Sequence, residues 1–142
     1  MKGLKRGRLR MAVITTAKYL APEILGEFSQ LYPGIDLALK VTNRDRVNER
    51  IQANEDDLYI VGHEPTDLDA VESFHFAPNP LVVIAPRSHP LVGQKNVPLE
   101  VIAREPFIAR EPGSGIRDAT LRAFDAIGTR PKIRMELGSN EA

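Results

Sequence analysis

Small polar side chains directly follow three apolar runs of the sequence, at places where they could bind a ligand. In an open α/β sheet, ligands bind beyond the carboxyl ends of the strands, where loops lead into helix N-termini with free backbone N–H groups. Hydroxyl and amide groups there suit a small anionic or polar metabolite. Each stretch alone is also explained as a helix cap, and the agreement of all three favours binding. The three stretches are Thr15-Thr16-Ala17, Thr42-Asn43 and Gly113-Ser114-Gly115.

The third stretch lies between the apolar residues 106–109 and a segment with helical spacing that starts near Ser114. Its glycines allow the backbone to come close to whatever fills the turn. Ser114 could cap the helix with its own side chain, or the helix N-terminus could seat an anion with the help of Gly115. The turn by itself leaves both interpretations open.

The other candidate side chains predict no catalytic residue and no metal site. His63 and Glu64 lack the HExxH helix pattern, and neither His75 nor His89 stands at a ligand-like spacing from them. Ser114 lacks the GxSxG context of an acyl-transfer nucleophile. The glycines form neither a P-loop nor a GxGxxG dinucleotide fingerprint. The motifs therefore favour a binding function over catalysis.

Composition indicates a globular protein without disulfide or thiol chemistry. The 142 residues are 42% hydrophobic and include no cysteine, which fits a cytoplasmic location. Five of the 19 basic residues fall in the first ten positions, which leaves 14 bases against 19 acids in the rest. Such an acidic body is a poor surface for nucleic acid, and the basic start is better explained as a solvated linker end than as a DNA-binding arm. No apolar run has the length of a signal-peptide core or a membrane span.

Strand-like and helix-like segments alternate along the chain, which predicts parallel α/β sheets. The first half should contain strands at 9–14, 35–41 and 58–62, a helix with Leu20, Ile24, Phe28 and Leu31 along one face, and a helix capped by Asn43. Two strands without a helix between them, at 70–76 and 80–86, are typical of a crossover between lobes. The second half should contain a short helix within 89–105, a strand at 106–109, a helix at 114–127 ended by Gly128, and a strand at 132–137.

The last residues, "GSNEA", combine a serine that can cap a helix, Ser139, with residues that favour helix formation. A strand followed by a capped helix start is an unusual end for a domain. We therefore expect a chain that is truncated at this point.

Four phrases of the sequence resemble the effector-binding domain of LysR-type transcriptional regulators, from about Gly7 to the last residue. The stretch "GRLRMAVITTAKYLAPEILGEFSQLYPGIDLALKV" looks like the start of that domain. The phrases "NPLVVIAPRSHPL", "PFIAREPGSGIR" and "MELGSNEA" match its later landmarks in order. Within the family, "TTAKYLAP" and "DDLYIVGHEPTDLD" look most like the regulators of RuBisCO operons.

The resemblance implies an α/β fold of two lobes, like a type II periplasmic solute-binding protein, incomplete at the C-terminus. It divides the chain into a linker stump at 1–8, a partial first lobe at 9–78, a partial second lobe at 79–138 and the start of a truncated helix at 139–142. A coinducer binds in the cleft between the lobes of this family. The residues implied to line the cleft are Thr15, Thr16, Asn43, Ser114 and Gly115, with His63 as a lesser candidate and Arg44 or Arg117 as sources of charge or as plain surface arginines.

For the RuBisCO-operon branch, the resemblance implies a small effector such as a sugar phosphate, phosphoglycerate or NADPH, and no resident cofactor. It implies a cytoplasmic bacterial regulator that forms a homodimer or tetramer and has no contact with a membrane. Promoter DNA would be bound only through a helix-turn-helix domain that this chain lacks. The family helix that starts at "SNEA" packs against the partner's first helix, here residues 18–31, so its loss puts dimerisation of this chain in doubt.

Two other functions share the predicted fold class. A solute-binding protein of a transporter would be supported by a secretion signal or a lipidated cysteine, and neither is present in the sequence. A small α/β enzyme would need an acid or base at the cleft, for which His63 is the only plausible residue.

Overall fold

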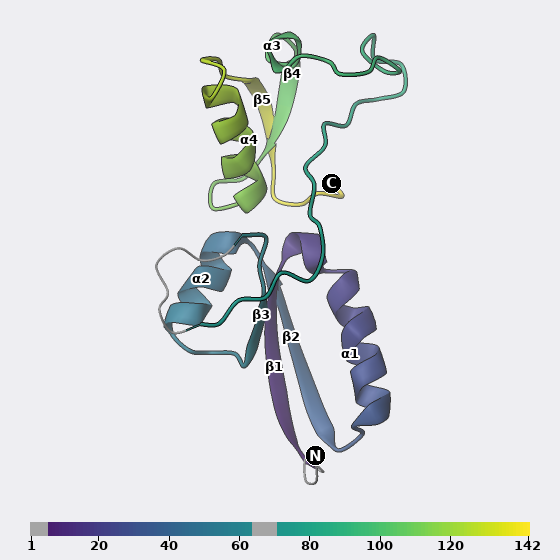
Figure 1. The fold of residues 1–142 in the computed structure, drawn as a ribbon, viewed down its shortest axis with the longest axis vertical. Coiled ribbons are helices and arrows are strands. Elements are labelled where there is room, and N and C mark those ends of the chain that lie inside the picture. Colours follow the sequence, from purple (N-terminus) through teal and green to yellow (C-terminus); the bar gives the residue numbers. More distant parts are fainter. Residues whose placement is uncertain (1–5, 64–70) are drawn as a thin grey trace. The chain divides into compact units, whose positions relative to one another are not determined.

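The computed structural model describes residues 6–63 and 71–142, and the chain divides into two compact units at Phe74/His75 (Figure 1). Each unit combines a parallel β-sheet with helices. In the first unit, the strand order is β2-β1-β3, so the chain crosses over the central strand between β2 and β3. The elements of this unit are β1 (Gly7–Ile14), the 3-10 turn η1 (Thr15–Ala17), α1 (Leu20–Leu31), β2 (Ile35–Thr42), α2 (Arg44–Gln52) and β3 (Leu58–Ile60).

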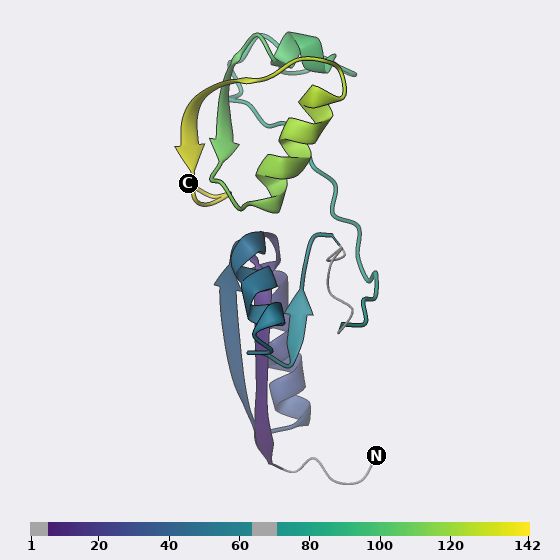
Figure 2. The ribbon, with the colours of Figure 1, turned by 90° about the vertical axis from the view of Figure 1, so that its left-hand side faces the viewer.

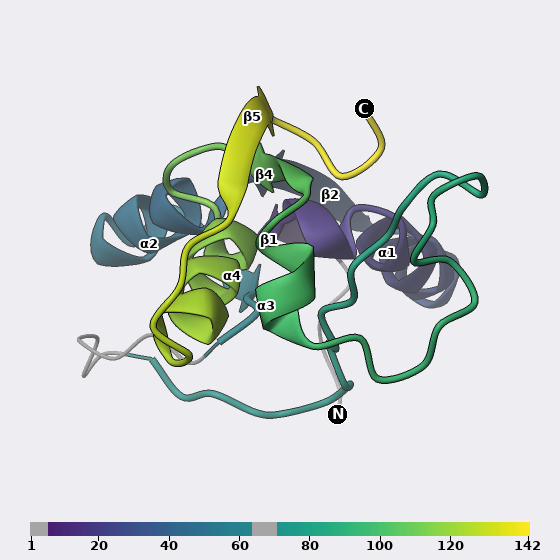
Figure 3. The same ribbon diagram turned by 90° about the horizontal axis from the view of Figure 1, so that it is seen from above.

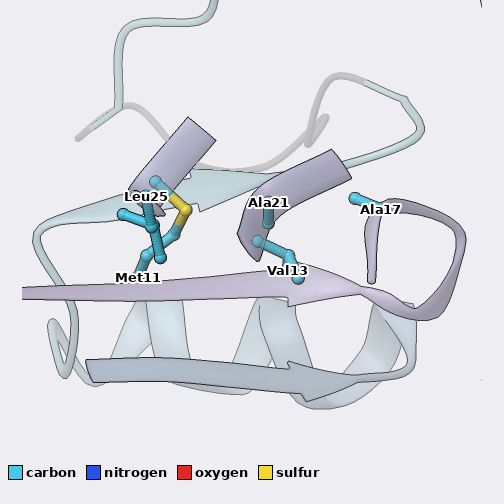
Figure 4. Packing of buried hydrophobic residues seen from close by; sticks show 5 residues of the cluster. All are labelled: Met11, Val13, Ala17, Ala21 and Leu25. Atoms are coloured by element: carbon cyan, nitrogen blue, oxygen red, sulfur yellow. The ribbon is translucent and has the colours of Figure 1, made fainter. Parts of the chain in front are cut away.

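The central strand β1 is buried on both faces because side chains alternate along a strand. Met11 and Val13 pack against α1, together with Ala17, Ala21 and Leu25 (Figure 4). Ala12, which is fully buried, points to the opposite face, and the buried Val47 and Ile51 lie on the helix α2 that contacts β1. The two helices accordingly lie on opposite faces of the sheet (Figure 2). A continuous apolar run such as "MAV" is typical of a strand that is covered on both sides.

The helix α1 is formed as predicted, but the apolar face that the spacing points to is not the buried one. Ala21 and Leu25 face the sheet, whereas Leu20, Ile24 and Leu31 are 39%, 42% and 73% exposed. Apolar residues occupy most of the circumference of this helix, so periodicity alone does not select the packed face. Ala21 and Leu25 pack in one cluster with Met11 and Val13 of β1, so tertiary packing decides which face of α1 is buried.

A network of polar side chains joins the end of α2 to β3. Arg50 forms a two-pronged ion pair with Asp56, through Nε–Oδ2 at 2.7 Å and Nη2–Oδ1 at 2.9 Å. The Asp56 carboxylate is only 4% exposed. The hydroxyl of Tyr59 accepts a hydrogen bond from the Asp56 backbone N–H and donates one to the carbonyl oxygen of Arg50. These bonds fix the short turn that returns the chain to the sheet.

The second unit is built on two parallel strands with one helix packed along them (Figure 3). The aromatic rings of Phe107 and Phe124 meet edge to face, with their centroids 5.8 Å apart, and Phe124 is 1% exposed. This contact holds the helix against the sheet. The elements of this unit are α3 (Leu99–Ile102), β4 (Pro106–Arg110), α4 (Gly115–Asp125) and β5 (Lys132–Leu137).

The predicted strands at 70–76 and 80–86 are wrong for the described part of those segments. Residues 71–76 and 80–86 pair with no strand among the described residues, and residue 70 lies outside them. Val82 and Ile84 are 77% and 83% exposed. A β-branched run has strand propensity, but a strand forms only where a neighbouring edge accepts its backbone hydrogen bonds.

Residues 138–142 contain no helical turn in the structure. The Ser139 hydroxyl accepts a hydrogen bond from the Glu141 backbone N–H, as a capping serine does, and also donates to the Glu141 carboxylate. Within the described residues, no helix combines the length and the apolar character that crossing a membrane requires.

Candidate functional site

The register of the first sheet brings the predicted polar residues of that unit together. Ile14 at the end of β1 pairs with Thr42 at the end of β2, so Thr15 and Asn43 follow at adjacent positions. On the other side of β1, Val13 pairs with Ile60 of β3. The chain after β3 therefore leaves the same edge of the sheet. Three loops thus meet at the carboxyl ends of three parallel strands, which is where α/β sheets bind ligands.

The two threonines form the first turn after β1. Thr15 is half-buried and Thr16 is exposed, and both lie in η1, whose N-terminal flanking residue Ile14 makes no side-chain capping bond. The carbonyl oxygen of Thr15 accepts a hydrogen bond from the Lys18 backbone N–H at 3.3 Å. Both threonines therefore lie in a tight 3-10 turn that directly follows the carboxyl end of β1.

Asn43 is the N-cap of α2, as predicted. Its Oδ1 accepts a hydrogen bond from the backbone N–H of Arg46 at 3.1 Å. The cap occupies one side-chain oxygen and leaves the side-chain amide nitrogen as a donor. Asn43 therefore fulfils the structural role, and any role in binding is additional to it.

The charged candidates of the first unit are less well placed. Arg44 pairs with the neighbouring Asp45, through Nε at 3.1 Å and Nη2 at 2.9 Å. His63 is exposed, and it is the last described residue before the undescribed segment 64–70, in which Glu64 falls. Within residues 6–63 and 71–142, no three histidine, cysteine or acidic side chains are grouped as metal ligands.

The Gly-Ser-Gly stretch of the second unit begins α4 after a tight turn. Gly113 has φ +84°, and the backbone N–H of Ser114 donates to the carbonyl oxygen of Glu111 at 3.2 Å. Proline in the second place and a positive-φ glycine in the third fit a type II turn. The role of Gly113 is thus conformational, because an L side chain is strained at this backbone angle. Gly115 is the first residue of the helix.

Ser114 occupies the N-cap position but does not cap the helix with its side chain. It is 3% exposed, its side chain makes no capping hydrogen bond, and its carbonyl oxygen accepts the backbone N–H of Asp118 at 3.2 Å. The first N–H groups of an α-helix have no partner within the helix. Of the two interpretations of this serine, side-chain capping is therefore wrong, because the Ser114 hydroxyl accepts no hydrogen bond from the first turn of α4.

Two arginines next to this turn are held by other parts of the second unit. Nη1 of Arg117 donates to the carbonyl oxygen of Arg110 at 2.6 Å and to the Glu136 carboxylate at 2.8 Å. Arg110, which no sequence motif indicated as a site residue, is 7% exposed and pairs with Glu111. The signal available in the sequence was a charged residue directly after the apolar positions 107–109. Arg117 is therefore a structural arginine here.

Comparison with known proteins connects the chain to one family. The family model described as the LysR substrate binding domain matches residues 2–142. The HTH-type transcriptional activator CmpR of Synechocystis sp. PCC 6803 is 49% identical over all 142 residues, and a RuBisCO operon transcriptional regulator of Acidithiobacillus ferrooxidans is 44% identical. The chain spans 46% of the length of each of these relatives.

A solved structure extends the comparison to three dimensions. The regulatory domain of Synechocystis PCC6803 CcmR in complex with 2-PG is 52% identical, with a TM-score of 0.86 over 96% of this chain and 65% of that one. Effector-binding domains of this kind have the two-lobed, type II periplasmic-binding-protein-like α/β fold, so the fold class predicted from the sequence is confirmed.

Proposed function

The chain belongs to the LysR substrate-binding domain family, and from this premise we propose that it is the coinducer-sensing domain of a transcriptional regulator. Its ligand is a small anionic metabolite, and it performs no catalysis. The relatives are named transcriptional regulators, which favours this function over transport or an enzyme activity.

The observation that carries the proposal is the N-terminus of α4. Ser114 is buried at the N-cap position while its side chain leaves the backbone donors of the first turn to another acceptor. A helix N-terminus carries about half a positive charge and favours anions. A phosphate or carboxylate group of the effector would accept hydrogen bonds from the Ser114 hydroxyl and from the backbone N–H groups of Gly115 and Ile116.

The polar edge of the first unit supplies the remaining contacts in this proposal. Thr15, Thr16 and Asn43 offer hydroxyl and amide groups at adjacent strand ends, and His63 lies after the third strand of the same sheet. These groups suit the hydroxyl or second acidic group of a phosphorylated metabolite. The relative CcmR was solved with 2-phosphoglycolate, a molecule with one phosphate and one carboxylate, which fits this donor set.

In the full-length regulator, we propose that effector binding shifts the equilibrium between two arrangements of the subunits on promoter DNA. A ligand can shift such an equilibrium only as far as its affinities for the two states differ. DNA binding belongs to a helix-turn-helix domain, and the intact protein is a cytoplasmic homodimer or tetramer. Sugar phosphates, phosphoglycerate and NADPH complete the set of candidate effectors.

The experiment is a thermal-shift panel on the full-length protein with 2-phosphoglycolate, ribulose bisphosphate, phosphoglycerate, phosphoenolpyruvate, NADPH and sulfate. A ligand that binds only the native state stabilises it by about 2.7 kcal/mol at one hundred times its dissociation constant. We expect a selective rise in melting temperature for one phosphorylated metabolite, and none for sulfate at equal concentration.

Two variants and one control locate the binding. Ser114→Ala and Thr16→Ala should abolish the rise without changing the melting temperature of the unliganded protein. Ser29→Ala is the matched control, because its hydroxyl only donates to the Gly26 carbonyl oxygen in the last turns of α1. A rise that survives both site variants would contradict the assignment of the site. Chemical turnover of a bound metabolite would contradict the proposal that the protein is not an enzyme.

A further inference from the structure

A buried arginine at the end of β4 joins the turn before α4 to the segment after β5. Arg110 is 7% exposed although it carries a permanent charge. Its Nε and Nη2 donate to the two carboxylate oxygens of Glu111, at 2.8 and 3.1 Å. On its other side, Nη1 donates to the side chain of Asn140, and Nη2 lies 3.5 Å from the carbonyl oxygen of Gly138. One guanidinium thus holds two segments that are separated by α4 and β5 in the sequence.

The pairing of Arg110 with its immediate neighbour fixes where the turn begins. Consecutive side chains of a strand point to opposite faces, so two of them can pair only where the chain leaves the extended conformation. That place is Glu111, whose carbonyl oxygen then accepts the backbone N–H of Ser114 at 3.2 Å. Ser114 in turn accepts the N–H of Asp118. A continuous series of contacts therefore runs from the guanidinium to the start of α4.

We infer that Arg110 is a positioning residue for the proposed effector seat, and that it couples occupancy of the seat to residues 138–140. The inference rests on the proposed function, because it concerns the regulation of the same site. Arg110 acts through Glu111 and needs no contact with the effector. A buried charge that loses its partner is strongly unfavourable, so the guanidinium follows any movement of the Glu111 carboxylate. Asn140 and Gly138 are bound to the same guanidinium and move with it.

The test compares full-length wild-type protein with Arg110→Met and Arg110→Lys. Methionine removes the charge, and lysine keeps the charge but lacks the planar fork that binds both carboxylate oxygens. Glu111→Gln is a milder third variant, should the Arg110 variants fold poorly. Arg46→Met is the matched control, because Arg46 forms an exposed ion pair with Glu49 on α2. The measurements are the dissociation constants of 2-phosphoglycolate and of ribulose bisphosphate, which carries two phosphates and a larger charge, and amide hydrogen exchange of residues 138–142 with and without each ligand.

We expect at least a tenfold weaker affinity in Arg110→Met and Arg110→Lys, by the same factor for both ligands, and unchanged affinity in Arg46→Met. Ligand should slow exchange at residues 138–142 in the wild type and the control, and should have no effect there in the Arg110 and Glu111 variants. A loss of affinity that is larger for the more highly charged ligand would mean that Arg110 contacts the effector directly, and would overturn the positioning role. Unchanged affinity and exchange in the variants would overturn the inference alone. Failure of the wild type to bind any ligand of the thermal-shift panel would overturn the proposed function and the inference with it.

Discussion

Ile14 and Thr42 are the last paired residues of β1 and β2, and their pairing makes the following residues, Thr15 and Asn43, neighbours at one edge of the sheet. The two residues are 28 positions apart in the chain. Their adjacency is a consequence of parallel pairing without a shift in register, which holds from Gly7 and Ile35 to the strand ends. The register of the sheet therefore determines which polar residues lie side by side at this edge of the first unit.

Two substitutions of Asn43 separate its capping role from its proposed role in binding. Asn43→Ala should lower the free energy of unfolding by about 1 kcal/mol, because the bond to the Arg46 N–H is lost, and Asn43→Asp should retain the cap. If Asn43 also contacts an anionic effector, the new carboxylate should repel that effector. We expect wild-type stability with weaker effector binding in Asn43→Asp, measured by urea unfolding and by thermal shift. Loss of stability in both variants would argue against the cap.

A side chain at Gly113 should destabilise the protein. At φ +84°, Gly113→Ala is expected to cost about 1 kcal/mol of stability and to weaken effector binding, since the turn positions Ser114. Gly26→Ala is the control, because Gly26 lies inside α1 with open space around its Cα. There, alanine should stabilise by about 0.5–1 kcal/mol through helix propensity. Urea unfolding of both variants measures the two changes in the free energy of unfolding. If both changes had the same sign, the explanation from backbone conformation would be refuted.

Asp57 makes the stability of the first unit depend on pH in the acidic range. The backbone N–H of Arg10 donates to its carboxylate at 2.8 Å, and this bond, with the Arg10 side chain, lowers the pKa of Asp57 from its ordinary value of 3.8. A carboxyl with a lowered folded-state pKa stabilises the protein above its unfolded pKa. That contribution disappears as the pH falls through the folded value.

The corresponding measurement is the melting temperature between pH 6 and pH 2 for wild type and Asp57→Asn. We expect the wild type to lose stability faster than the variant below about pH 4. Parallel curves for the two proteins would contradict a contribution from Asp57.

The ion pair between Arg50 and Asp56 should contribute more than the exposed pairs on the surface. Asp56→Ala removes the two-pronged partner of Arg50, which keeps its ion pair with Glu55 at 2.6 Å, and we expect a loss of about 2 kcal/mol in urea unfolding. Tyr59→Phe removes one hydroxyl that bridges two backbone groups and should cost about 1 kcal/mol. Glu49→Gln, which breaks an exposed pair with Arg46, should stay within 0.5 kcal/mol, roughly the scatter of surface changes. Equal costs at Asp56 and Glu49 would contradict the role of burial.

The exposed apolar run 81–84 should make this 142-residue chain prone to self-association. Its side chains are between 50% and 83% exposed, and its extended backbone has no strand partner among the described residues. Segments of this kind are aggregation hazards. Val82→Lys with Ile84→Lys should lower light scattering on heating, whereas Gln52→Lys, at an exposed position at the end of α2, should not. Equal scattering from all three proteins would exclude this segment as the cause.

Most of the secondary structure could be predicted from the sequence, because the signals are local. The runs "LRMAVI" and "IDLALKV", the turn at Tyr32-Pro33-Gly34 and the cap at Asn43 are each within a few residues of the element that they start or stop. The same signals misled at 80–86, where β-branched residues have strand propensity but no partner edge in the described structure. Strand propensity belongs to a single segment, whereas a strand forms only when a second segment pairs with it.

The sequence by itself determined the α/β class, the order of most elements and the position of the three polar loops at strand ends, for which we propose ligand binding. Tertiary structure alone decided three further points. The register of β1 against β2 made Thr15 and Asn43 neighbours, and packing of Ala21 and Leu25 with Met11 and Val13 decided the buried face of α1. The hydrogen bonds of Arg110 to Glu111 and to residues 138–140 tied the turn before α4 to the segment after β5. Each depends on groups that lie far apart in the chain. Hydrogen-bond ladders, packing and buried charge pairs form only once folding brings those groups together, so no local pattern encodes them.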